Sequence, residues 1–262
     1  MKQVNFHTHT FRCHHASGKD EEYVKHAIDQ GFEVLGFSDH GPWKYKTAYH
    51  SSMRMEIKEF EGYKKSILSL KEKYKDQIDI YLGLEVEYFP QYMDWLDMFC
   101  KEEQVDYILF GNHYHETDEY NQYYPYAGKD TFDQYIEDCL AGMKTGLYSY
   151  LAHPELIMMN DGLEWDKHVD EQFHRICQSA KELDLPLEYN AAGMMGNRWF
   201  GESYPHHKFW EIAGQYHNKA LVGMDAHSPE QLSQNIYLEA MHSLSIYDVE
   251  IIDTIKMNQF KK

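Results

Sequence analysis

The chain opens with VNFHTHT (residues 4–10), a short apolar run that ends in two histidines. Six further runs of the same kind follow it. They are VLGFSDH (34–40), YLGLEVE (81–87), YILFGNH (107–113), YSYLAHPE (148–155), LPLEYNA (185–191) and LVGMDAH (221–227). Six of the seven carry a potential metal ligand at or near the C-terminal end. One histidine at a strand end means little, but this repetition indicates strand ends that converge on one metal centre.

Segments with helical periodicity separate the runs. In residues 55–75, apolar side chains recur at alternating steps of three and four, which predicts a helix with one buried face. The predicted helices span about 20–30, 55–75, 91–103, 130–145, 167–184, 206–217, a segment that starts at Ser228-Pro229, and 247–259. Strands that alternate with helices indicate an α/β fold with a parallel sheet. Seven such units without a linker predict a single domain over residues 1–262, built as a closed or nearly closed barrel.

The composition limits the classes of partner. The formal net charge is −18, and only four arginines occur in the chain, which argues against a partner that presents nucleic-acid phosphates. No apolar stretch approaches the roughly 20 residues that span a bilayer, and the first run begins too early for a signal peptide. We therefore expect a cytoplasmic protein with no nucleic-acid or membrane partner, and the oligomeric state stays open. The 17 histidines are the compositional outlier.

The metal ligands belong at the C-terminal ends of the strands, where β/α barrels carry their active sites. His7 and His9 are two residues apart on a strand, so both side chains point to the same side. Asp225 and His227 repeat that spacing on the seventh run, which would lie beside the first run in a closed barrel. The intervening runs add His40, Glu85, His113 and His153. Imidazoles mixed with carboxylates favour zinc, manganese or iron over calcium or magnesium.

Taken in order, these motifs resemble the PHP (polymerase and histidinol phosphatase) family. The matching pieces are the opening HxH, a histidine six residues further on at His15, SDH at 38–40, GLE at 83–85, and the GNH, AHPE and DAH motifs. The resemblance covers essentially the whole chain. It implies a distorted (β/α)7 barrel that holds three divalent transition-metal ions.

The resemblance also implies how the ligands divide among the ions. The first ion would take His7, His9, Glu85 and Asp225, the second His15, His40 and His227, and the third Glu85, His113 and His153. Spacing alone groups His227 with Asp225, and we prefer the grouping that the resemblance implies. His14 competes with His15, and the family spacing favours His15. Glu87 faces the same side as Glu85 and is expected to support a ligand from outside.

A chain of about this length, with CxHA at 13–16 and no attached polymerase, is similar to the histidinol-phosphatase branch of the family. That similarity implies hydrolysis of L-histidinol phosphate to L-histidinol and phosphate, in histidine biosynthesis, by attack of a metal-bridging hydroxide. The alkoxide leaving group needs a proton, and Asp225 and His227 are the candidates that could supply it.

Phosphoryl transfer also needs positive charge on the non-bridging oxygens. A glycine-rich loop is predicted after the sixth run, the one run without a metal ligand. Arg198 lies in this loop and is the candidate for a bidentate contact to phosphate. Arg54, Trp43 and Trp199 are further candidates for contact with the substrate. The tyrosine-rich segment 115–128 is too long for a plain connector and is a candidate lid.

Three other functions remain open. A phosphoesterase of the same fold could act on a nucleotide, a phosphotyrosine or another small phosphate ester. A metal-stabilised binding module would hold ions without turnover. A metal-dependent deaminase is a further alternative, because HxH after the first strand also begins many amidohydrolase sites, although the GLE and AHPE motifs point away from it.

Overall fold

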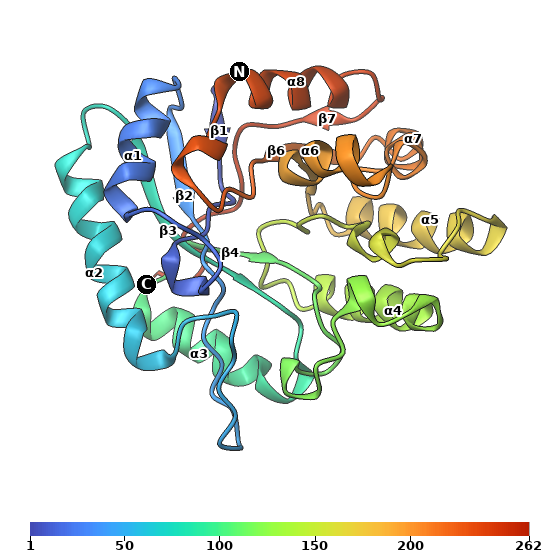
Figure 1. Cartoon of the computed structure of the whole chain (residues 1–262), viewed down its shortest axis with the longest axis horizontal. Helices are drawn as coiled ribbons and strands as arrows, with labels where there is room; N and C mark the ends of the chain where they lie inside the picture. The colour runs from blue at the N-terminus through green and yellow to red at the C-terminus, as the bar shows by residue number, and fades with distance from the viewer. Residues whose placement is uncertain (262) are drawn as a thin grey trace.

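The computed structural model describes residues 1–261 and shows an α/β fold around a curled parallel sheet (Figure 1). The strands are β1 (Val4–Asn5), β2 (Val34–Phe37), β3 (Asp79–Val86), β4 (Tyr107–Phe110), β5 (Leu187–Asn190), β6 (Lys219–Gly223) and β7 (Glu250–Ile251). Every pairing between these strands is parallel. Each predicted run supplies a strand except the fifth, of which only Leu151 pairs with its neighbours.

Two sheet segments, β1-β2-β3-β4 and β5-β6-β7, form one distorted barrel. Leu151 joins them on one side, because it bridges both Phe110 and Leu187 in parallel register. On the other side Thr8 bridges Ala226, and the backbone N–H of His9 donates to the carbonyl of Ala226 at 2.9 Å. The first and seventh runs are therefore neighbours, as predicted, and their ligands lie at the same end of the barrel.

Helices surround the strands (Figure 1). They are α1 (Asp20–Asp29), α2 (Ile57–Lys73), α3 (Met93–Glu103), α4 (Phe132–Met143), α5 (Lys167–Glu182), α6 (Ala191–Phe200), α7 (His207–Gln215) and α8 (Gln234–Leu244). Six of the predicted helices match α1 to α5 and α7 to within two residues at each end. Within residues 1–261, no helix is both long enough and apolar enough to cross a membrane.

Helix α6 corrects the prediction of a loop after the sixth run. Asn190 ends β5 and caps α6 at once, because its side-chain oxygen accepts from the N–H of Gly193 at 2.8 Å. The alanines and methionines that follow are good helix formers, and they outweigh the glycines among them. The helix stops at Gly201, whose φ of 88° lies in the left-handed region.

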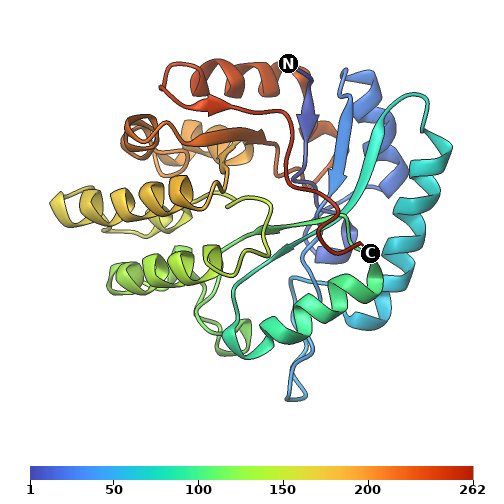
Figure 2. The same ribbon diagram turned by 180° about the vertical axis from the view of Figure 1, so that it is seen from behind.

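The predicted helix over residues 247–259 is wrong. The chain forms β7 there and then runs beneath the barrel to end beside α3 (Figure 2). Backbone hydrogen bonds hold this tail, from Ile252 N to Ala220 O at 2.8 Å and from Asn258 N to Asp106 O at 2.7 Å. The backbone groups of the tail find hydrogen-bond partners in the barrel. These partners are distant in sequence, so the periodicity of the tail does not predict them.

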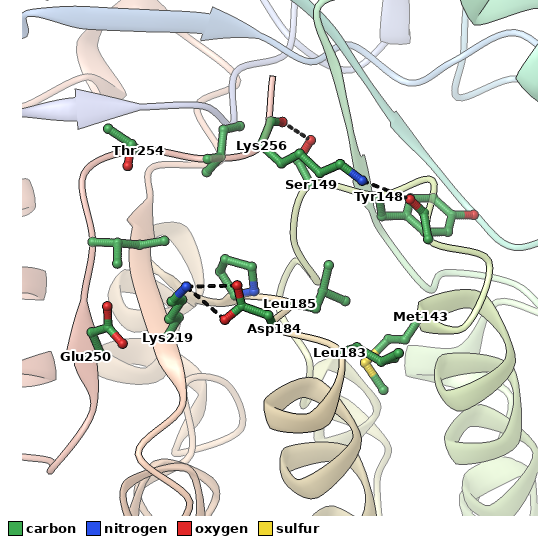
Figure 3. A pocket seen from close by; sticks show the side chains of 14 residues that line it. Met143, Tyr148, Ser149, Leu183, Asp184, Leu185, Lys219, Glu250, Thr254 and Lys256 are labelled. Atoms are coloured by element: carbon green, nitrogen blue, oxygen red, sulfur yellow. Dashed lines mark hydrogen bonds and ion pairs between the residues drawn. The ribbon is translucent and has the colours of Figure 1, made fainter. Parts of the chain in front are cut away.

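A cavity of about 510 Å³ lies where this tail passes the N-terminal ends of the strands (Figure 3). Lys219 and Asp184 form an ion pair on its wall, with Nζ to Oδ1 at 2.8 Å. The Ser149 hydroxyl donates to the carbonyl of Lys256 at 2.7 Å. None of the predicted metal ligands lines this cavity, so the candidate chemistry belongs to the opposite end of the barrel.

Tyr107 fills the interior of the barrel and ties three strands together. Its hydroxyl donates to the carbonyl of Phe6 at 2.7 Å, with the carbonyl of Phe37 at 3.2 Å. The ring lies directly against Gly83 on the neighbouring strand β3, so that a β-carbon at Gly83 would overlap it. The packing of Tyr107 in the barrel interior therefore requires glycine at position 83.

We predict that Gly83→Ala lowers the free energy of unfolding by about 1–3 kcal/mol, the usual cost of overpacking a filled core. Gly62→Ala is the matched control, because Gly62 lies on α2 with no atom within 4 Å of the added carbon. Alanine is the better helix former, so this control should stabilise the protein by up to about 1 kcal/mol. Urea titrations would measure both, and equal stability of the two variants would contradict the packing described for Tyr107.

Candidate metal centre

A cavity of about 160 Å³ opens at the C-terminal ends of the strands. Its lining consists of His9, His15, His40, Met53, Glu85, His113, Tyr123, His153, Leu156, Tyr204, Asp225 and His227. Eight of the nine predicted metal ligands are in this set. The ninth, His7, is fully buried beside it, with its Nε2 atom 3.1 Å from Nε2 of His9. The structure thus brings all nine predicted ligands together.

Glu85 lies at the middle of the group. The ring nitrogens nearest to its two carboxylate oxygens belong to His7 at 3.5 Å, His9 at 3.2 Å, His40 at 3.1 Å, His113 at 3.3 Å and His153 at 3.0 Å. Burial alone would raise the pKa of Glu85, but the charges of the surrounding imidazoles hold it well below its usual value. Glu85 is therefore a carboxylate that can be shared between cations.

Asp225 is the second carboxylate of the group. Its Oδ1 atom lies 3.4 Å from Nε2 of His7 and 3.3 Å from Nε2 of His9. The backbone of Asp225 has a φ of 48°, and His153 has a φ of 30°. Left-handed backbone is uncommon in residues with a side chain and is often found at functional sites. The fold thus holds these two predicted ligands in strained conformations.

His15, His40 and His227 form a second set, in which one ligand atom of each lies within 4.8 Å of the others. The Nδ1 atom of His15 is 2.7 Å from the Cys13 carbonyl, and that of His227 is 3.0 Å from the Asp225 carbonyl. These contacts leave each Nε2 free for the cavity. His14 does not line the cavity, and its Nδ1 atom lies 3.3 Å from the Ser52 carbonyl. The structure therefore brings His15, and not His14, to the lining of the cavity.

Glu188 supports His7 from outside the ligand group. Its Oε1 atom lies 2.7 Å from Nδ1 of His7, and Oε2 accepts from the backbone N–H of His153 at 3.1 Å. A β-carbon at Gly223 would overlap this carboxylate, so the adjacent strand leaves space for it. The sixth run therefore supports the predicted ligands, a role that was not predicted. A charged residue inside an apolar strand was the available signal.

Glu87 plays the same part for His113, as expected, with Oε1 at 3.1 Å from Nδ1 of that ring. Arg54 binds the same carboxylate through Nη2 at 2.7 Å and reaches Asp118 through Nε at 3.0 Å. Burial would raise the pKa of Glu87, but Arg54 first and then His113 bring it down to about 2. Trp43 completes the cluster by donating from Nε1 to Glu87 at 3.1 Å.

The donor set fits divalent transition-metal ions. The facing Nε2 atoms of His7 and His9 can share at most one proton, and a cation would satisfy both. The Nδ1 atoms of His9 and His153 are buried without a hydrogen-bond partner among residues 1–261. Burial holds the pKa of His40 well below its usual value, which favours the neutral imidazole that binds metal. For His7 and His9 the neighbouring carboxylates outweigh burial and raise the pKa.

The predicted substrate contacts lie away from the cavity. Arg198 is on α6, where its guanidinium pairs with Glu239 on the surface, and Trp199 beside it is 81% exposed. Arg54 and Trp43 are buried in the cluster around Glu87. None of the four lines the cavity, and their contact with substrate stays a prediction. Side chains that were not singled out line it instead, namely Met53, Tyr123, Leu156 and Tyr204.

A family model for the PHP domain matches residues 5–192. The chain belongs to the PHP family. It is 25% identical over 241 residues to a Deinococcus radiodurans protein named "Probable histidinol-phosphatase", across 86% of each chain. A Schizosaccharomyces pombe protein of the same name is 23% identical over 258 residues, which are 90% of this chain and 84% of that one.

Among solved structures, the fold is similar to that of histidinol phosphate phosphatase from Lactococcus lactis, which was crystallised with zinc, L-histidinol and phosphate. The TM-score is 0.69 at 17% identity, with 97% of both chains covered. This likeness confirms the distorted barrel. Together with the family match, the buried histidines and carboxylates make the chain a PHP-family phosphoesterase with a candidate site for divalent metal ions.

We predict that Glu188→Gln weakens metal binding by about 10- to 100-fold, as is usual when the partner of a metal-binding histidine is changed. The amide preserves shape but removes the charge that orients His7. Competition with a chromophoric chelator would measure the affinity, with the melting temperature as a check on folding. Glu239→Gln on the surface is the control, and an affinity equal to that control would contradict the support of His7 by Glu188.

We also predict that Arg54→Met destabilises the protein by about 3–5 kcal/mol, because it leaves Glu87 and Asp118 buried without their cation. The matched control is Arg175→Met, which removes an exposed pair with Glu137 and should cost less than about 1 kcal/mol. Unfolding in urea would measure both. Similar small losses would show that Arg54 is not held by its partners and is available for substrate.

Proposed function

We propose that the chain hydrolyses L-histidinol phosphate to L-histidinol and phosphate, a reaction of histidine biosynthesis. The observation that carries the proposal is the group of nine side chains, Glu85 and eight others, gathered at one small cavity at the C-terminal end of the barrel. The names of the relatives from Deinococcus and Schizosaccharomyces, which align over most of this chain, support the substrate. The cavity is sized for the phosphate end of a small ester rather than for a polymer.

Three ions would be held as the family resemblance implies, with Glu85 shared between two of them. Bound divalent ions would activate water as the nucleophile and offset the negative charge of the phosphate. The zinc in the related Lactococcus structure supports zinc as one of the metals, beside manganese and iron.

Within the chain, Asp225 is the candidate to accept a proton from the attacking water and to pass it to the leaving alkoxide. Its Oδ2 atom accepts from Nδ2 of Asn190 at 3.2 Å, which orients the carboxylate toward the cavity. His227 lies 3.5 Å from Oδ1 of the same carboxylate and is the second candidate for this proton transfer. Both groups belong to the lining of the cavity in which the ester would bind.

The test is phosphate release by the purified, metal-loaded protein. We expect kcat/KM for L-histidinol phosphate to exceed that for p-nitrophenyl phosphate and for a nucleoside monophosphate by at least about tenfold. Metal analysis should find close to three equivalents, and removal by a chelator should abolish turnover until metal is restored. A preference for the nucleotide or for phosphotyrosine would replace the proposed substrate with another small ester. Bound metal without any turnover would support a binding module instead.

A further inference from the structure

We propose that the phenol groups of Tyr123 and Tyr204 bind the phosphate of the substrate. This inference rests on the proposed phosphatase function and goes beyond it, because it names the protein groups that hold the substrate's charged end. It would make this a phosphate site whose direct protein donors are neutral hydroxyls.

Among residues 1–261, no lysine or arginine lines the metal cavity. Each arginine of the chain already has a carboxylate partner elsewhere. Arg12 binds Asp20, Arg54 binds Glu87 and Asp118, Arg175 binds Glu137, and Arg198 binds Glu239. A phosphate in this cavity would therefore need other hydrogen-bond donors from the protein in addition to the ions.

Tyr204 lies between α6 and α7 and reaches the cavity across the surface of α6. Its ring stands nearly perpendicular to that of His153, with centroids 6.2 Å apart and an angle of 80°. A β-carbon at Gly193 would overlap both the backbone carbonyl and the ring of Tyr204. Gly193, in the segment predicted as a loop, therefore provides the space in which this tyrosine lies against the helix.

Tyr123 comes from the tyrosine-rich segment 115–128 and faces the same part of the cavity. It forms an antiparallel bridge with Tyr114, and the next residue, Tyr124, donates its N–H to the carbonyl of His113 at 2.8 Å. Its ring is stacked over that of His113, with centroids 6.4 Å apart and an angle of 22°. The segment that was expected to be a lid thus places one side chain over the predicted ligands.

The two phenols flank the ligands His113 and His153 from two different loops. Neither hydroxyl makes a hydrogen bond to any residue in the part of the chain described, 1–261. A phenol carries its proton at neutral pH, so both hydroxyls can donate to a phosphate oxygen.

The experiment measures binding of inorganic phosphate to the metal-loaded full-length protein by calorimetry. We expect Tyr204→Phe and Tyr123→Phe each to raise Kd by about ten- to a hundredfold, as loss of a hydrogen bond to a charged group implies. Metal content should remain that of the unmodified protein. With p-nitrophenyl phosphate, the Ki of inorganic phosphate should rise in parallel.

Tyr126→Phe is the matched control, because Tyr126 belongs to the same loop and contacts Tyr123 but is 74% exposed. Its Kd for phosphate should not change. The proposal is overturned if the Tyr123 and Tyr204 variants bind phosphate like this control, or if they lose metal. It is also overturned if Arg198→Ala weakens phosphate binding more than either tyrosine variant does.

The two proposals fail in different ways. If p-nitrophenyl phosphate is hydrolysed but L-histidinol phosphate is not preferred, the proposed substrate is wrong. A loss of phosphate affinity in the tyrosine variants would still support the phenol contacts in that case. If L-histidinol phosphate is preferred but the tyrosine variants keep full affinity for phosphate, only the phenol contacts are wrong.

Discussion

The contact between Glu85 and five imidazoles is the constraint on which the rest of the centre depends. An unpaired carboxylate in the interior costs several kcal/mol, and Glu85 is only 1% exposed. Its strand, β3, lies between β2 and β4, so histidines from several neighbouring strand ends can reach it at once. A slip of one residue in the register of β3 would turn the side chain of Glu85 to the other face of the sheet, away from these histidines. The strand pairing that builds the barrel is therefore also what brings the predicted ligands together.

An outer layer of acceptors sets the direction of the imidazoles. Glu188 and Glu87 lie against Nδ1 of His7 and His113, while backbone carbonyls serve His15 and His227. With Nδ1 engaged, the Nε2 atom is the one presented to the cavity. Glu85 and Asp225 are predicted metal ligands, whereas Glu188 and Glu87 act on the histidines and not on the ions.

Much of the fold and of the candidate site is local enough to be seen in the sequence. Ligand spacing such as His7-x-His9 depends only on strand alternation, and the amphipathic pattern of α2 depends only on its own residues. The outcome differed where distant contacts decide the structure. The tail after β7 pairs with Ala220 and Asp106, far away in sequence, and Asn190 caps a helix that its glycines disfavour. Tyr204 enters the site only through the packing of its ring on Gly193.

Arg54 shows what a cation does among these carboxylates, because it is held by Glu87 and Asp118 at 2.7 and 3.0 Å and has no free approach to the cavity. An arginine placed beside Glu85 or Asp225 would pair with them in the same way and compete with metal ions for their oxygens. A phenol donates a hydrogen bond without carrying a charge, so it does not compete. In a cavity that contains the carboxylates of Glu85 and Asp225, neutral donors such as Tyr123 and Tyr204 can contact phosphate and leave the metal ligands undisturbed.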